Sequence, residues 1–520
     1  MASRFQAAFL GSRWLSSRLL RVKDHVHLAT FAPTGAGKGV AVVLVNLLSY
    51  IISMAVVDVK GELFRLTAHH RKMQFRHRIF LFDPLGVTGS AGISDCFNPL
   101  DLIDESAPDF LDQCRALACL IVVRTDREDN PHWNDCAQIV ICVLIVFVCA
   151  MERDHSKRNF NTIRTILSSR QRFAQAIKVM QQVDACQQVV AREGGKLSWF
   201  EGEELASVQT TVQRHMEFLD SPAIARHVSR STFDIRMLLS GMATVYFCLP
   251  QDKLASLAGL MRMWIGMVLT VTQRQGSERN PVLWMLDEVG HIGHVDALEQ
   301  AVTLGRGSGT RLWFIFQDHD QVRKCFGDNA LTVLGNINTQ QYFGLTSYAT
   351  AEAVSNRVGE MTIRVASDGS NSGSSHQSGP RDGSSTRSSG SSITWSNAAR
   401  KLYKPEEILS LEPDIALILH RHHPVMPAKL VKYYDAPEFR KNWLGSFGTG
   451  RQHGLGLAAV MLAAAALLLA VRLADVATHM PVPVAAQPRA TGARPLPYLR
   501  PAPRPVNRSP YRRAQYHSLH

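Results

Sequence analysis

The order of apolar and polar positions along the chain predicts a parallel α/β sheet. Short apolar runs of strand length alternate with longer apolar stretches of helical length, which is the pattern of repeated strand, loop and helix. The predicted strands are Val26–Phe31, Met54–Val59, Ile79–Phe82, Met242–Leu249, Val282–Leu286 and Arg311–Phe316. Predicted helices between them include Val40–Ser53, Leu254–Gln273 and Ala297–Leu304. The fold class expected from this pattern is α/β.

Residues 102–237 follow a different pattern and predict an all-α inserted domain. The long segments Pro108–Val123, Trp133–Met151 and Gln171–Val190 are rich in Ala, Leu, Gln and Arg and carry few strand signals. This domain would divide the α/β domain into a first part, 1–101, and a second part, 238–435.

Three further segments differ in composition from the predicted domains. Residues 367–393 are mostly Ser and Gly and bury no core, so we predict a disordered, mobile loop. A linker within 436–474 contains an uncharged, Ala- and Leu-rich run, 454–471, which just reaches the length needed to cross a bilayer. A helix that packs against a partner is the alternative for this run. The Pro- and Arg-rich tail, 475–520, is predicted to be disordered.

Charge and cysteine content narrow the class of protein only slightly. The formal net charge is +13 over 520 residues, but most of the excess follows residue 450, where Asp475 is the only acid. The remaining surface is mildly basic, which a soluble protein explains as well as nucleic-acid binding does. The nine cysteines form no CxxC pair and several lie in apolar runs, which indicates buried free thiols in a reducing compartment. The first residues lack a sustained apolar run, so we predict no signal peptide and expect the chemistry on the cytosolic side.

The segment Ala32–Gly39 is the strongest candidate for chemistry. A strand leads into a Gly-containing loop and then a helix, which places backbone N–H groups around a phosphate at the helix N-terminus. Lys38 would pair with the β- and γ-phosphates of a nucleotide. Ala32 and Gly39 depart from the P-loop pattern, because Gly39 lacks the hydroxyl that reaches Mg²⁺. The alternative is an accidental Gly-rich turn. The predicted nucleotide-binding residues are Thr34, Gly35, Ala36, Gly37, Lys38, Gly39 and Val40.

A second motif, at the end of the predicted strand Val282–Leu286, supplies two acids. Asp287 would lie beside Mg²⁺, and Glu288 would polarise water for attack on the γ-phosphate. Gln317 follows the next predicted strand and could sense the γ-phosphate between the two motifs. Arg306, in a Gly-rich loop, is a candidate arginine finger that reaches across a subunit boundary, and a solvated loop charge is its alternative.

These motifs together resemble the type IV secretion coupling proteins of the TraG/TraD type. The resemblance covers roughly residues 11–435, and in this family Gly39 is usual in place of Ser or Thr. It rests on segments that follow in the family's order: Gly11–Trp14, Ala32–Gly39, Asp58–Glu62, Asp83-Pro84, Phe97–Leu100, His132-Trp133, Asp287-Glu288, Arg306–Gly309, Gln317, Leu402–Leu411 and Lys432–Tyr434.

The resemblance implies a RecA-like P-loop NTPase with a parallel central sheet and an inserted all-α domain. Its cofactors would be ATP and Mg²⁺. Its partners would be single-stranded DNA with a relaxase complex, or a protein substrate, and the components of a type IV secretion channel. Such motors assemble as homohexamers on the cytoplasmic face of the bacterial inner membrane, and contacts to DNA phosphates need no sequence reading.

The ends of the chain depart from the family pattern. Two membrane helices usually precede the motor, but here the P-loop begins at residue 32. The anchor would come from a membrane partner or from residues upstream of an annotated start. If 454–471 spans the membrane, the Arg-rich tail crosses against the positive-inside tendency. Two other functions remain open: a related chromosomal DNA translocase, and a nucleotide-binding docking platform without productive turnover.

Overall fold

The computed structural model describes residues 8–13, 19–22, 27–90, 92–124, 130–200, 202–377 and 384–435. The predicted linker and membrane helix within 436–474 and the predicted tail 475–520 lie outside the described residues, as does Trp14.

One sheet of 11 strands organises the described residues, in the order β2-β1-β13-β12-β9-β3-β8-β7-β4-β6-β5. The strands from β9 to β5 in this order run parallel, as the sequence predicts. The predicted strands correspond to β3 (His27–Phe31), β4 (Met54–Val57), β5 (Arg78–Phe82), β6 (Ala243–Phe247), β7 (Val282–Asp287) and β8 (Thr310–Phe316).

An antiparallel extension that the sequence pattern does not predict completes one side of the sheet. Strand β12 pairs antiparallel with β9 and so attaches the extension to the parallel strands. The pairs β12–β13, β13–β1 and β1–β2 are also antiparallel. The strands on this side are β1 (Ala8–Arg13), β2 (Leu19–Val22), β9 (Thr339–Tyr342), β12 (Ile415–His420) and β13 (Met426–Lys429). Several are only four residues long, too short for a clear period-two pattern.

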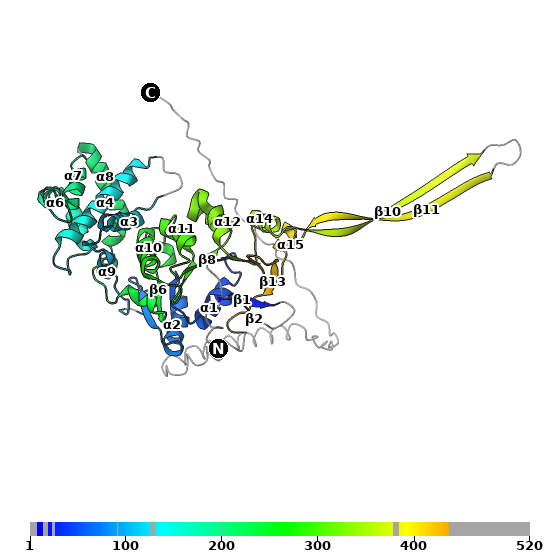
Figure 1. The fold of residues 1–520 in the computed structure, drawn as a ribbon, viewed down its shortest axis with the longest axis horizontal. Coiled ribbons are helices and arrows are strands. Elements are labelled where there is room, and N and C mark those ends of the chain that lie inside the picture. Colours follow the sequence, from blue (N-terminus) through cyan, green and yellow to red (C-terminus); the bar gives the residue numbers. More distant parts are fainter. Residues whose placement is uncertain are drawn as a thin grey trace, which may run out of the picture. The chain divides into compact units, whose positions relative to one another are not determined.

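Helices cover both faces of the sheet, which is why its central strands are continuously apolar. Along β4, Ala55 and Val57 pack into one core while Met54 and Val56 pack into the other. One face carries α1 (Leu44–Ser49) and α2 (Glu62–Gln74); the other carries α10 (Ala258–Gln275), α11 (Asp296–Leu304) and α12 (His319–Phe326) (Figure 1). The short helices α13 (Ala330–Asn336), α14 (Tyr348–Val358) and α15 (Pro405–Leu409) complete this domain.

The chain between β5 and β6 is helical, which confirms an α/β fold with an all-α insertion; the boundaries 102 and 237 stay predictions. The insertion contains α3 (Phe110–Ile121), α4 (His132–Met151), α5 (Phe160–Leu167), α6 (Arg170–Gln182), α7 (Val189–Leu197), α8 (Gly202–Met216) and α9 (Pro222–His227). The segment Gln171–Val190 spans most of α6 and the start of α7, and Cys186, Gln187 and Gln188, which have positive φ, lie between the two helices.

Helix α4 is the described helix that is long and apolar enough to cross a membrane, with a mean hydropathy of 2.2 over its best window. It packs against α3, α7 and α8, and 61% of that window is buried within the protein. A core helix of a folded domain that does not cross a membrane has the same length, hydropathy and burial.

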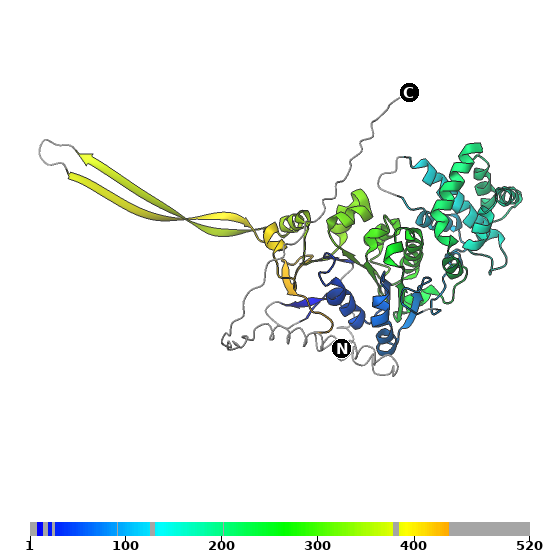
Figure 2. The same ribbon diagram turned by 180° about the vertical axis from the view of Figure 1, so that it is seen from behind.

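The predicted disordered loop 367–393 is strand at its described residues, 367–377 and 384–393. Strands β10 (Glu360–Gln377) and β11 (Ser384–Lys401) pair antiparallel from Glu360–Lys401 to Gln377–Ser384 and form a long hairpin that extends away from the sheet (Figures 1 and 2). The composition correctly indicates that no core is buried here. It does not forbid a ladder, because backbone N–H and C=O groups pair without buried side chains.

Candidate nucleotide-binding site

The loop that follows β3 has the shape of an anion-binding loop at the start of a helix. The φ angles of Gly35 and Gly37 are +86° and +88°, a region that other residues rarely adopt. Helical structure begins at Gly39 and continues into α1, while Thr34 and Gly35 are exposed. Backbone N–H groups of this loop are therefore available to a phosphate at the helix N-terminus.

Two alanines of the loop, Ala32 and Ala36, make close contacts with neighbouring strands or loops that hold the loop in position. Ala32 is completely buried and its N–H donates to Phe316 O at 2.9 Å, which extends the pairing of β3 with β8 by one residue. Behind the loop, Gly344 has a φ of +59°, and a Cβ there would lie 3.0 Å from Ala36 Cβ. A glycine at position 344 thus lets the chain after β9 support the loop closely, a contact that sequence reasoning missed because it is not local.

The two acids at the end of β7 lie beside the lysine of the loop. Lys38 Nζ donates to Glu288 Oε1 at 3.0 Å and lies 3.7 Å from Asp287 Oδ1. The three side chains are only 11–20% exposed. Glu288 adopts a left-handed conformation with a φ of +58°, which is uncommon for a residue other than glycine. Such local strain is frequent at functional sites.

Strand order explains how Gln317 reaches the same edge. Strand β8 lies between β3 and β7, and all three are parallel, so their carboxyl ends meet at one edge of the sheet. Gln317 directly follows β8, and its backbone N–H donates to the side chain of Gln321 at 2.8 Å. Gln317 therefore lies between the loop of Lys38 and the acids of β7.

Burial makes Asp287 a poor place for a bare negative charge. It raises the pKa of Asp287 to about 6, against the opposing effect of the nearby Lys38 ammonium. Its Oδ1 atom is buried and makes no hydrogen bond within the described residues. A buried carboxylate oxygen without a hydrogen-bond donor fits a divalent cation such as Mg²⁺, which prefers oxygen ligands. The positive charge of Lys60 also lowers the pKa of Asp287, against the effect of burial. The position of Lys60 in the sequence, after β4, did not reveal this role.

Arg306 is not brought to this edge within the same chain. It is exposed in the loop before β8, at the amino end of that strand. Because β8 is seven residues long and rises about 3.3 Å per residue, Arg306 lies roughly 20 Å from the edge where Lys38 lies. Any role in catalysis would require the site of a neighbouring subunit.

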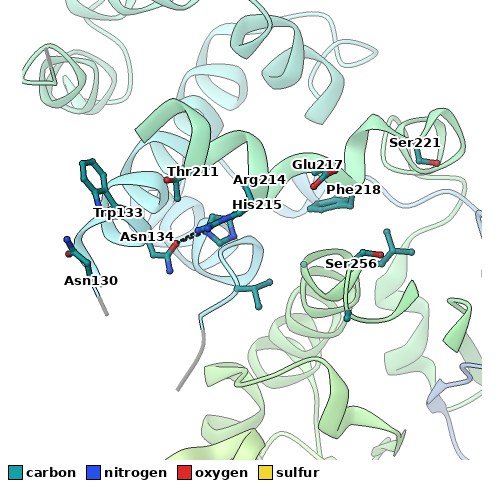
Figure 3. A pocket seen from close by; sticks show the side chains of 14 residues that line it. Asn130, Trp133, Asn134, Thr211, Arg214, His215, Glu217, Phe218, Ser221 and Ser256 are labelled. Carbon is teal, nitrogen blue, oxygen red and sulfur yellow. Dashed lines mark hydrogen bonds between the residues drawn. The ribbon is translucent and has the colours of Figure 1, made fainter. Parts of the chain in front are cut away.

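A separate cavity of about 800 Å³ lies between the inserted helices and the segment that leads into α10 (Figure 3). In its wall, His215 Nε2 lies 2.7 Å from Asn134 Oδ1, and Arg214 donates to the same oxygen. Burial lowers the pKa of His215 to about 4. The labelled lining residues are Asn130, Trp133, Asn134, Thr211, Arg214, His215, Glu217, Phe218, Ser221 and Ser256. None of the predicted nucleotide-binding residues lines this cavity.

Solved structures with a similar fold include conjugative coupling proteins. The unbound TrwBΔN70 matches with a TM-score of 0.56 at 16% identity, over 79% of this chain and 86% of that one. TrwB in complex with ADP and Mg²⁺ matches with a TM-score of 0.54 at 16% identity, over 78% and 85% of the two chains. This likeness confirms the expected RecA-like P-loop NTPase fold.

Sequence comparison gives the same family. Conjugal transfer protein TraG of Escherichia coli is 28% identical over 365 residues, 66% of this chain and 56% of TraG. Protein VirD4 of Agrobacterium fabrum is 25% identical over 439 residues, 83% of this chain and 62% of VirD4. The chain thus spans less than two thirds of the length of these relatives. The model of the family "Type IV secretory system Conjugative DNA transfer" matches residues 6–449. The resemblance drawn from the motifs is confirmed, and the chain belongs to the type IV secretory system conjugative DNA transfer family.

Proposed function

We propose that this chain is an ATP-hydrolysing coupling motor, which recruits relaxase-bound single-stranded DNA or a protein substrate and pumps it into a type IV secretion channel. One observation carries the proposal: Lys38, Asp287 and Glu288 come from distant parts of the sequence and meet at the edge where the Gly-rich loop lies. This arrangement combines a phosphate-binding loop with an acid for a metal ion and an acid for a water molecule.

In this proposal each group has a separate task. Backbone N–H groups of residues 34–40 bind the phosphates of ATP, and Lys38 pairs with the β- and γ-phosphates. Asp287 would hold Mg²⁺, which neutralises phosphate charge when it is bound. Glu288 orients and polarises the attacking water, and Gln317 detects whether the γ-phosphate is present. Gly39 offers no hydroxyl, so Asp287 would be the main side chain toward the metal.

Membership in the family supports DNA and the secretion channel as partners and the inner membrane as the location. One relative is named a conjugal transfer protein, and a VirD4 protein of Bartonella henselae is named a type IV secretion system-coupling protein. We infer that six copies form a ring at the cytoplasmic face of the bacterial inner membrane, next to the channel components. The ring would hold DNA through phosphate contacts, which are sequence-independent and weaken as salt rises.

ATP turnover by the purified full-length chain, with and without single-stranded DNA, tests the proposal. We expect turnover that DNA stimulates and that Lys38→Ala and Glu288→Gln abolish. The exposed residues Lys324 and Glu352 provide matched controls, because Lys324→Ala and Glu352→Gln change the same residue types away from the site. Nucleotide binding without turnover under every condition would instead favour a docking platform.

The role of Arg306 is best tested by mixing inactive subunits. If Arg306 acts on a neighbouring site, Arg306→Ala and Lys38→Ala chains would each be inactive. Their mixture would regain part of the turnover, because some interfaces then combine an intact Arg306 with an intact Lys38. Full turnover by Arg306→Ala alone would remove Arg306 from the catalytic groups and leave it as a loop charge.

A further inference from the structure

Three side chains that commonly bind transition metals meet where α4 and α8 pack together. His132 occupies the first turn of α4, and Cys136 lies one turn later on the same face of that helix. Glu204 comes from the first turn of α8. One ligand atom from each residue lies within 4.8 Å of the other two. None of these three residues takes part in the candidate nucleotide site.

The two distances from His132 to the other ligand atoms fit the coordination sphere of zinc. His132 Nε2 lies 3.4 Å from Glu204 Oε1 and 3.6 Å from Cys136 Sγ. Zinc binds nitrogen and oxygen at about 2.1 Å and sulfur at about 2.3 Å with tetrahedral angles, so neighbouring ligands are expected about 3.4 Å (N to O) and about 3.6 Å (N to S) apart. The third pair, Cys136 Sγ and a Glu204 carboxylate oxygen, lies within 4.8 Å, so one ion would reach all three atoms once the partly exposed Glu204 side chain closes any remaining gap to the sulfur.

The donor set and its exposure indicate which ion is bound and how the site is completed. An imidazole with a thiolate favours zinc over magnesium or calcium, which prefer oxygen ligands alone. The side chains of His132 and Glu204 are 52% and 43% exposed, whereas Cys136 is buried. Water therefore has access to a fourth coordination position on the outer side. The alternative is an ordinary surface ion pair of His132 with Glu204 beside an inert thiol.

We propose that His132, Cys136 and Glu204 bind one Zn²⁺ ion, with water as the fourth ligand. The ion ties the start of α4 to the start of α8. Trp133 and Asn134, the two residues that follow His132, line the cavity between the inserted helices and the segment that leads into α10 (Figure 3). The metal thereby holds one wall of this cavity in place, independently of nucleotide at Lys38.

Cobalt is a suitable probe, because Co²⁺ replaces Zn²⁺ and its bond to a thiolate absorbs near-ultraviolet light. The full-length chain is treated with a chelator, titrated with Co²⁺ and then with Zn²⁺. We expect one equivalent of Co²⁺ to produce the thiolate band and visible bands of tetrahedral intensity, and one equivalent of Zn²⁺ to remove both. Cys136→Ser should lose the thiolate band, and His132→Ala and Glu204→Gln should weaken it.

Matched controls separate this site from the other thiols and histidines. Cys96→Ser, His69→Ala and Glu203→Gln change residues of the same type outside the group, and Glu203 directly precedes Glu204 on α8. All three should keep the band and the stoichiometry. A thermal shift by Zn²⁺ that is present in the controls and absent from Glu204→Gln would support the site even if Cys136→Ser folds poorly. Binding below stoichiometry, or equal loss in Cys96→Ser and Cys136→Ser, would overturn the proposal.

Discussion

The ammonium group of Lys38 and the carboxylate of Glu288, 250 residues apart in sequence, form a hydrogen bond of 3.0 Å. It joins the loop after β3 to the end of β7 across the intervening strand β8. The ammonium has three donors, so Lys38 can keep Glu288 oriented while it also binds a phosphate. The pair therefore connects the group that binds nucleotide with the group proposed to activate water.

Changing the two partners should separate binding from hydrolysis. Glu288→Gln keeps a hydrogen-bond acceptor for Lys38 but removes the base, so we expect ATP affinity to stay within about threefold and kcat to fall at least ~100-fold. Lys38→Ala should weaken ATP binding as well. Equilibrium binding of a fluorescent ATP analogue, together with steady-state turnover, measures both. Normal turnover in Glu288→Gln would exclude Glu288 as the base.

Asp287→Asn should stabilise the nucleotide-free protein and remove its response to Mg²⁺. Burial raises the pKa of Asp287 to about 6 from 3.8. As pH rises, the unfolded chain releases this proton first, so stability is lost between about pH 4 and 6 and stays lost above it. At pH 8 we expect Asp287→Asn to raise the free energy of unfolding by about 2 kcal/mol.

Thermal unfolding with ATP, with and without Mg²⁺, checks both halves of the Asp287 prediction. Wild type should gain stability when Mg²⁺ is added to ATP, and Asp287→Asn should not. A full Mg²⁺-dependent shift in Asp287→Asn would show that the metal is held elsewhere. Asp328→Asn, at an exposed position of the short 3-10 helix Gly327–Asn329, is a matched control and should behave as wild type.

Gly37→Ala should damage the loop through its backbone rather than through crowding. Gly37 has a φ of +88°, and the nearest atom that an added Cβ would meet is Val40 Cγ2 at an ordinary 3.7 Å. The cost should therefore be the left-handed conformation itself, about 1–2 kcal/mol, with a matching loss of ATP affinity of roughly tenfold. Isothermal titration measures the affinity.

Gly39→Ala provides the matched control in the same loop. A Cβ at Gly39 meets no atom within 4 Å, and its φ lies outside the left-handed region. We expect ATP affinity within about twofold of wild type, with a small gain in helix stability. Equal losses in Gly37→Ala and Gly39→Ala would contradict the assignment of strain to Gly37.

His227→Phe should make the protein less sensitive to acid. Burial lowers the pKa of His227 to about 3, and its ring packs against Phe82 and Trp264. As pH falls below about 6.5, the unfolded chain takes up the proton first, so stability is lost progressively toward pH 3. At pH 5 this histidine alone should cost about 2 kcal/mol. The slope of stability against pH, from urea unfolding between pH 7 and 5, should become shallower in His227→Phe.

The sequence by itself determined the class of fold and the chemical groups. The strand before Ala32–Gly39, the apolar strand before Asp287 and the helical pattern of the insertion are local signals, because burial period and backbone preference are set within a few residues. The order of the motifs was sufficient to indicate the family. These local signals did not predict the short strands β9 and β13, because four-residue segments carry too little periodicity.

The tertiary structure alone decided which residues meet. The position of β8 between β3 and β7 brings Gln317 to the edge where Lys38 and Glu288 pair, and the same strand direction puts Arg306 at the opposite edge. The meeting of Cys136 with Glu204 depends likewise on how α4 packs on α8. Strand order and helix packing are set by contacts between segments far apart in the chain. A local pattern of apolar and polar residues does not specify which distant strand or helix a segment will contact.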